Sequence, residues 1–359
     1  MDVLDASVAW GVILALPLLL LLPVEQAHVA AFFGYGAGFP SRDCENAHIG
    51  DLLDKRLAFV TGKGGVGKTT VAYALALAAA DRGKRVIVCE IASQERGPDL
   101  FGKRPSDTVE RQLAKGLWTI SVDPDLMVGE YLETHMPVRA MAGLLRRSTL
   151  FNYLAAATPG LPEMVTMGKV WELTQKPRRV KDAKRTYDMV VVDAPATGHG
   201  VGFLQTPRTF REIARVGPLA NQAKRIEDVI TDRDNAGVAI VARPEEMAVN
   251  ESMELEAILL DPPKGSSFAV DRIFANGVYP DRFSAAERKR IAAVGSGARS
   301  IAAPAVDAVA EEAERRSSQD SQLARLREGT VGSITELPFL FSPRLGEPEL
   351  RELAAVVAG

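Results

Sequence analysis

Short, mostly apolar segments alternate along the chain with segments whose apolar positions recur every three or four residues. The short segments are 56–61, 85–90, 117–122, 188–193, 238–241, 272–275 and 334–337. Residues 188–193 form an apolar run between two aspartates, a pattern typical of a parallel strand that is covered on both faces. We therefore predict a strand at each of these segments.

Helical patterns fill the intervals between the predicted strands. Residues 67–81 are rich in Ala and Leu, with Gly83 placed to end the helix, and residues 347–357 predict a closing helix. Residues 125–175 have apolar positions, several of them Met, at helical spacing. The order of elements predicts a doubly wound, mostly parallel α/β sheet that begins with a right-handed βαβ unit. A helical insertion is expected at about 125–180, between the second and third principal strands.

Residues 1–48 do not fit this pattern, and we separate them from the domain predicted at 49–359. The candidate anchor 8–34 contains an almost wholly apolar run, 8–23, which is slightly shorter than the ~20 residues of a spanning helix. Asp2 and Asp5 precede it, where a signal peptide has Lys or Arg. Three interpretations stay open: an extension translated from an upstream start codon, a membrane anchor, and a segment that is cleaved or buried. If it is an anchor, basic residues on its C-terminal side would keep the domain in the cytoplasm.

Composition excludes several classes of function. A formal net charge of −3 gives no basic excess, so we expect no nucleic acid partner. The two cysteines, Cys44 and Cys89, cannot form a disulfide framework or a paired-cysteine zinc site within one chain, and they fit a cytoplasmic protein. Cys89 lies in a predicted strand, and we interpret it as a small core residue.

A glycine-rich segment connects the first predicted strand to the first predicted helix. Its sequence satisfies the P-loop pattern, with Gly62, Gly67, Lys68 and Thr69 at the fixed positions. Glycines allow backbone N–H groups to surround phosphate oxygens, and the helix directs its positive end at them. The lysine reaches the terminal phosphates and the threonine hydroxyl binds Mg²⁺. We predict that ATP and Mg²⁺ are bound by Gly62, Lys63, Gly64, Gly65, Val66, Gly67, Lys68, Thr69 and Thr70.

Two motifs resemble one family of P-loop proteins. The additional Lys63 is similar to the second lysine in the deviant P-loop of MinD, the nitrogenase iron protein, and the arsenite-pump and tail-anchored-protein-targeting ATPases. Residues 193–199, Asp-Ala-Pro-Ala-Thr-Gly-His, resemble switch II of the last two ATPases. The resemblance implies that Lys63 contacts the nucleotide of a second subunit and that Asp193 holds Mg²⁺ through water. It also implies that the turn ending at His199 senses the γ-phosphate.

Further matches extend this resemblance over about 55–357. By analogy with the family, Glu245 would lie near the nucleotide, Asn276 would recognise adenine, and Pro338 would lie in the loop beside the base. The resemblance implies a cytoplasmic, ATP-hydrolysing homodimer, or a heterodimer with a paralogous ATPase, and a membrane-protein client. The arsenite-binding cysteines are absent, so arsenite transport is not expected.

One departure concerns catalysis. The family commonly has a water-positioning aspartate just past the second strand, where Ala92 stands here, and Glu90 is the nearest carboxylate. Glu90 either substitutes for that aspartate, beside Lys63, Lys68 and Asp193, or only forms a surface pair. One alternative function is a nucleotide-binding scaffold, or the silent partner of an active paralogue. A membrane-tethered positioning protein like MinD is a second alternative, against which the Thr-Gly-His turn argues.

Two other segments have a plainer interpretation. The basic stretch 176–185 is expected to be a solvated loop. The methionines at 127, 136, 141, 164 and 167 are expected in the core, with a client-binding groove as the alternative.

Overall fold

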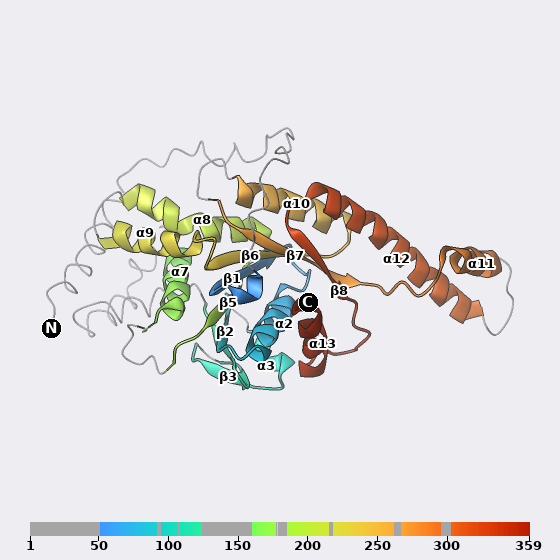
Figure 1. Ribbon diagram of the computed structural model, residues 1–359, viewed down its shortest axis with the longest axis horizontal. Coiled ribbons are helices and arrows are strands. Elements are labelled where there is room, and N and C mark those ends of the chain that lie inside the picture. Colours follow the sequence, from blue (N-terminus) through green and yellow to red (C-terminus); the bar gives the residue numbers. More distant parts are fainter. Residues whose placement is uncertain are drawn as a thin grey trace, which may run out of the picture.

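An eight-stranded sheet forms the centre of the protein (Figure 1). The computed structural model describes residues 51–91, 95–106, 108–123, 160–176, 178, 185–214, 218–261, 267–295 and 303–359. The strands lie in the order β3-β4-β2-β5-β1-β6-β7-β8. Their bounds are β1 Leu57–Gly62, β2 Val86–Glu90, β3 Arg111–Ala114, β4 Leu117–Ser121, β5 Met189–Asp193, β6 Ala236–Ala242, β7 Val270–Val278 and β8 Ser333–Pro338.

Every neighbouring pair of strands is parallel except β3 and β4, which pair antiparallel at one edge. This confirms the predicted mostly parallel α/β fold. Strand β3 was not predicted, because only one of its four residues is buried and the segment lacks an apolar run.

Helices cover both faces of the sheet. Their bounds are η3 Leu52–Asp54, α2 Lys68–Asp81, α3 Gly97–Leu100, α7 Leu161–Thr174, α8 Thr197–Ala214, α9 Pro218–Ile230, α10 Glu246–Leu260, α11 Ala285–Gly295, α12 Ala303–Gly329 and α13 Glu347–Val357. In Figure 1, α2 and α13 lie below the sheet, and α8, α9 and α10 lie above it.

Alternate residues of the central strand enter two separate cores. Leu57 and Phe59 of β1 pack with side chains of α7, α8, α9, α10 and α12. Ala58 and Val60 point to the opposite face and pack with α2 and α13. Because both faces are buried, the strand has no polar alternation, which explains the uninterrupted apolar patterns in the sequence.

Helix α2 is buried on all sides over most of its length. Its residues from Val71 to Ala79 are all buried, and α13 packs against it. Gly83, with a φ of 86°, follows the helix as predicted. The helix that begins at the P-loop is therefore fixed by packing, which also fixes the loop.

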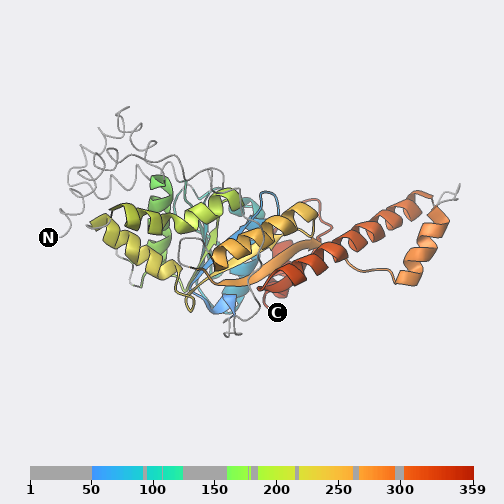
Figure 2. The same ribbon diagram turned by 90° about the horizontal axis from the view of Figure 1, so that it is seen from above.

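Two helices extend away from the sheet. Figures 1 and 2 both show α11 and the 27-residue α12 as a hairpin that projects beyond the edge of the domain. Among the described residues, from η3 to α13, no helix is both long and apolar enough to cross a membrane.

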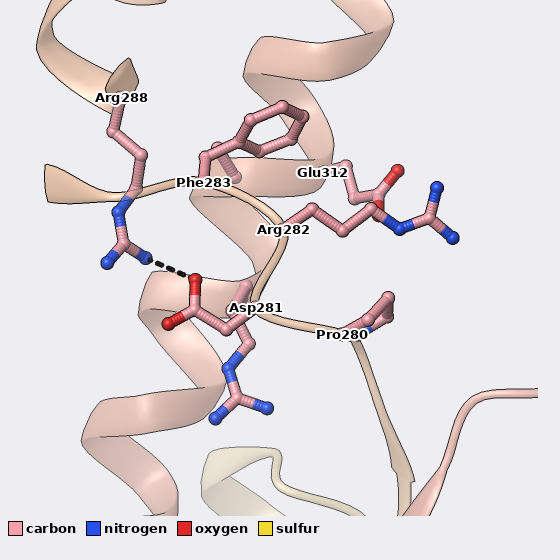
Figure 3. A pocket seen from close by; sticks show the side chains of 8 residues that line it. Pro280, Asp281, Arg282, Phe283, Arg288 and Glu312 are labelled. Carbon is pink, nitrogen blue, oxygen red and sulfur yellow. Dashed lines mark ion pairs between the residues drawn. The ribbon is translucent and has the colours of Figure 1, made fainter. Parts of the chain in front are cut away.

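A shallow hollow lies at the base of this hairpin (Figure 3). Asp281 and Arg288 form an ion pair of 3.6 Å in it, and Arg282 pairs with Glu312 at 3.3 Å. No lining residue belongs to the P-loop or to the switch II motif, so this hollow is not the predicted nucleotide site.

Parts of the predicted insertion and the whole N-terminal segment lie outside the described residues. These parts include residues 1–48, the apolar run 8–34, and Met127, Met136 and Met141. At the end of the insertion, α7 places Met164 and Met167 in the core, as predicted.

The basic stretch 176–185 is not simply a solvated loop. The side chain of Arg178 is only 2% exposed and forms ion pairs of 2.6 Å with Glu110 and Glu172. Lys176 pairs with Asp188 at 2.7 Å. The expectation was wrong for Arg178, because the fold brings two acidic partners to it: Glu110, which directly precedes β3, and Glu172 of α7.

Candidate nucleotide-binding site

The P-loop connects the end of β1 to the start of α2, as the sequence predicts. Gly62 has a φ of 144°, and a Cβ there would lie 2.2 Å from the carbonyl oxygen of Val241. Gly67 has a φ of 94°, and its Cβ would lie 2.3 Å from Nδ2 of Asn276. Both positions therefore require glycine, on grounds of backbone conformation and of space. The tight turn leaves the first N–H groups of α2 directed at the loop.

Lys68 folds back over this loop. Its Nζ donates to the carbonyl oxygen of Lys63 at 2.9 Å. Burial lowers the pKa of Lys68, and the charge of Asp193 opposes this effect. An ammonium group has three donors, so a single carbonyl leaves it able to bind phosphate oxygens.

Thr69 and Asp193 meet below the loop. Thr69 Oγ1 donates to Asp193 Oδ2 at 2.5 Å. The other carboxylate oxygen, Oδ1, is buried and has no hydrogen-bond partner among the described residues. Burial raises the pKa of Asp193 to about 6, against the Thr69 hydrogen bond and the charges of Lys68 and Arg96.

This pair of residues fits a magnesium ion. A buried carboxylate oxygen without a partner costs free energy, and a bound cation would remove that cost. Mg²⁺ prefers oxygen ligands and commonly binds through one or two protein groups together with substrate phosphates and water. The hydroxyl of Thr69 and the free oxygen of Asp193 are such groups.

The switch II motif lies beside the P-loop. Ala194 N donates to Val60 O at 3.0 Å, and a Cβ on Gly64 would lie 4.0 Å from that of Ala196. His199 is in the first turn of α8, and its side chain is outside the described set. Thr69 and Asp193 are 124 residues apart in the sequence, and their contact brings the two motifs together in the structure.

Glu90 ends β2 and is the register partner of Asp193 on β5. It is only 2% exposed and accepts hydrogen bonds from Tyr73 Oη at 2.6 Å, Arg96 N at 2.8 Å and Gly97 N at 2.9 Å. Burial raises its pKa to about 7, although these bonds oppose the shift. The expectation that Glu90 forms only a surface pair is therefore wrong, because the side chain is buried and holds the backbone at 96–97 in place. Ala92 lies outside the described residues.

Lys63 is held within its own chain. Its Nζ forms an ion pair of 2.5 Å with Oε1 of Glu251 in α10. The contact with a second subunit that the family resemblance implies remains a prediction.

Asn276 and Pro338 lie on adjacent strands at the same edge of the sheet. Asn276 Nδ2 donates to the P-loop carbonyl of Val66 at 2.8 Å. Pro338 ends β8 in register with Val278, and the next residue, Phe339, stacks on a tyrosine with ring centroids 4.6 Å apart. These positions are compatible with a base-binding role for both predicted residues.

Glu245 has a different environment. It precedes α10, and its half-exposed side chain pairs with Arg243 at 2.9 Å. No described contact joins it to the P-loop. Its predicted place near the nucleotide stays untested.

Sequence reasoning missed three residues of this site. Tyr73 and Arg96 contact Glu90, and Glu251 contacts Lys63. The partner of Lys63 lies in the Asn-Glu-Ser segment at 250–252 of α10, but nothing in the spacing assigns it to a lysine 188 residues away. Tyr73 has no pattern to distinguish it from the other buried residues of α2.

Comparison with known proteins agrees with this geometry. Residues 55–216 match the family described as anion-transporting ATPase. The ATPase BagA of Mycobacterium tuberculosis (strain ATCC 25618 / H37Rv) is 29% identical over 261 residues, which cover 71% of this chain and 73% of BagA. A putative arsenical pump-driving ATPase of Halobacterium salinarum is 27% identical over 212 residues, covering 55% of this chain and 31% of that protein.

A eukaryotic relative shows the same similarity over a shorter stretch. The ATPase get3 of Schizosaccharomyces japonicus is 29% identical over 192 residues, covering 49% of this chain and 54% of its own. All three relatives are named as ATPases, and the family match spans both the P-loop and the switch II motif. Residues 55–216 of this chain are thus similar to the anion-transporting ATPase family, and the chain is similar to the arsenical pump-driving and get3 ATPases.

Proposed function

We propose that this protein is a dimeric conformational switch that binds ATP with Mg²⁺ and hydrolyses it. One observation carries the proposal: Thr69 and Asp193 meet directly below the P-loop, and a buried oxygen of Asp193 has no partner among the described residues. A hydroxyl and a carboxylate in this place are the metal ligands of P-loop nucleotide hydrolases.

Each polar group of the site has a defined task in this proposal. Lys68 exchanges its bond to the carbonyl of Lys63 for bonds to the β- and γ-phosphates, where it neutralises charge. Thr69 and Asp193 would hold Mg²⁺, whose positive charge would stabilise the phosphate oxygens. Asn276 leaves its bond to Val66 for the adenine base, beside Pro338.

Lys63 acts across the dimer in this account. It leaves Glu251 and stabilises the charge on the nucleotide of the second subunit during hydrolysis. The partner is a second copy of the chain or a paralogous ATPase, and the client is a membrane protein, as the family resemblance implies. We place the protein in the cytoplasm, where ATP and a reducing environment are present.

A second function is favoured by one specific observation. Both carboxylate oxygens of Glu90 accept hydrogen bonds from Tyr73 or from backbone amides, so this side chain is engaged in holding structure. If no other acid orients water, the protein is a nucleotide-binding scaffold, or the silent partner of an active paralogue.

Two measurements on the wild-type protein separate these functions. Sedimentation velocity with Mg²⁺ and a non-hydrolysable ATP analogue should give a dimer, while the nucleotide-free protein should be less associated. Steady-state phosphate release should be detectable for the switch and absent for the scaffold. The dimeric switch would be contradicted if the protein binds the analogue yet stays monomeric when the analogue is present well above its dissociation constant from the protein.

A further inference from the structure

The segment after β2 is fixed by one buried carboxylate. Glu90 accepts a hydrogen bond from the backbone N–H of Arg96 and another from that of Gly97. A Cβ on Gly97 would lie 1.9 Å from the hydroxyl oxygen of Tyr73, so the backbone here packs directly on the tyrosine ring. Tyr73 itself donates to Glu90. The backbone at 96–97 is therefore held against the buried end of β2.

This anchoring places Arg96 at the edge of the metal site. Glu90 and Asp193 are register partners at the ends of two adjacent parallel strands. The residue bonded to Glu90 thus lies beside the strand end that carries the magnesium ligand.

The side chain of Arg96 is available for a ligand. The residue is exposed, and its backbone, rather than its guanidinium, makes the described bonds to Glu90. A guanidinium is planar, is always charged and presents donors that match the oxygens of a phosphate group. A fixed backbone with an exposed, charged side chain is suited to binding an anion without ordering a mobile loop.

We propose that Arg96 binds the γ-phosphate of ATP within its own subunit, as a catalytic cation that supplements Lys68. The inference rests on the proposed nucleotide site. The cation enters from the end of β2, where the family commonly has a water-positioning aspartate. Because ADP lacks the γ-phosphate, this contact also makes the protein prefer ATP to ADP.

The proposal links the nucleotide to the core. If Arg96 binds the γ-phosphate, the backbone of Arg96 connects this contact to Glu90, and Glu90 connects it to Tyr73 in α2. Loss of the γ-phosphate on hydrolysis would free the arginine side chain while the backbone anchor remains. Arg96 therefore reports the state of the nucleotide, and Glu90 acts as a positioning residue.

The test compares nucleotide affinities by calorimetry in the presence of Mg²⁺. The ligands are a non-hydrolysable ATP analogue and ADP. Arg96→Ala should weaken binding of the analogue by at least 10-fold and leave ADP affinity within 2-fold of wild type. Arg96→Lys should restore part of the loss. Arg104→Ala is the matched control, because Arg104 is an exposed arginine in the same segment, and it should change neither affinity. Phosphate release by Arg96→Ala should fall about 10²-fold or more at saturating ATP.

The outcomes separate this inference from the proposed function. If Arg96→Ala binds the analogue as wild type does, or loses affinity for ADP and the analogue equally, the γ-phosphate contact is wrong while ATP binding stands. If the wild type binds neither nucleotide, the proposed function fails and the inference fails with it. Thermal unfolding of each variant checks the fold, and Arg96→Gln replaces Arg96→Ala if the latter does not fold.

Discussion

The amino group of Lys63 lies 2.5 Å from the carboxylate of Glu251, so the second lysine of the P-loop is bound to helix α10 of its own chain. The two side chains are 30% and 34% exposed, and ion pairs with such exposure contribute about 1 kcal/mol or less. The pair is weak enough to open when a stronger anion is offered. A nucleotide phosphate on a second subunit is such an anion.

We predict from this pair that Lys63 controls association rather than ATP affinity. Lys63→Ala should bind ATP within a few-fold of wild type and should lose both ATP-dependent dimerisation and turnover, because the lost charge acts on the nucleotide of the partner subunit. Glu251→Gln removes the anion and leaves the lysine, so this variant should dimerise as well as wild type or up to about 5-fold more tightly. Sedimentation velocity with a non-hydrolysable ATP analogue measures the dimerisation of both variants. Dimerisation of Lys63→Ala at the wild-type concentration would rule out the role across the interface.

A second prediction concerns the metal. Asp193→Asn should abolish the increase in ATP affinity that Mg²⁺ gives, by about 10-fold or more, because a neutral amide oxygen replaces the carboxylate ligand. ATP binding in EDTA should change little. Asp188→Asn is the control, since Asp188 precedes the same strand at its opposite end and pairs with Arg85 and Lys176. Equal loss with and without Mg²⁺ would show that Asp193 acts on the fold or the phosphate directly.

The inner strands of this fold were predictable because both of their faces are covered. Strand β5 differs from its predicted bounds by one residue, and β1 is displaced by one residue at each end. Strand β3 was missed because an exposed edge strand has no continuous apolar run. The burial of Arg178 was missed for a different reason: of its partners, Glu110 is distant in sequence, and a basic residue in a basic stretch gives no sign that it pairs with Glu110 and Glu172.

The candidate site also contains residues that the sequence predicts and residues that it does not. The P-loop residues and Asp193 follow from local sequence, since strand, turn and helix are consecutive and the aspartate ends a buried strand. The role of Glu90 depends on Tyr73, which is 17 residues earlier, and on a backbone turn at Arg96 and Gly97. No periodicity predicts that three donors converge on one carboxylate. The contact appears only when β2, α2 and α3 are assembled.

The buried carboxyl of Glu90 leads to a prediction for how the free energy of unfolding depends on pH. Burial raises the pKa of this carboxyl from 4.5 to about 7, so between these values the folded chain binds more protons than the unfolded chain. Its contribution to stability is therefore complete below about pH 4.5 and is lost as the pH rises through about 7. In Glu90→Gln, the fall in the free energy of unfolding between pH 5 and pH 8 should be smaller by about 1–3 kcal/mol.

Urea denaturation of the nucleotide-free protein in EDTA measures this difference. The variant Glu314→Gln, at an exposed glutamate of α12, should retain the wild-type dependence on pH. The same pH dependence in Glu90→Gln as in wild type would mean that the Glu90 carboxyl does not titrate with a raised pKa in the folded chain.

A fourth prediction addresses hydrolysis. The sequence places Ala92 where the family commonly has a water-positioning aspartate, so turnover of the isolated protein should be slow. Ala92→Asp should raise kcat by about 10²-fold or more with little change in ATP affinity, because water is positioned only in the transition state. Ala92→Asn, which has the shape without the charge, is the control. Phosphate release that is fast in wild type and insensitive to both substitutions would show that another acid orients the water.

The central claim is that Lys68 and the loop around it bind ATP, and calorimetry of Mg·ATP with wild type and Lys68→Ala tests it most directly. The ammonium of Lys68 lies over the loop, 2.9 Å from the carbonyl of Lys63, in position to exchange that bond for phosphate oxygens. Its removal should weaken Mg·ATP binding by about 2–3 kcal/mol, which is roughly 30- to 150-fold. Lys224→Ala, at an exposed lysine paired with Asp228 on α9, should bind as wild type does. Wild-type affinity in a folded Lys68→Ala protein would contradict the account.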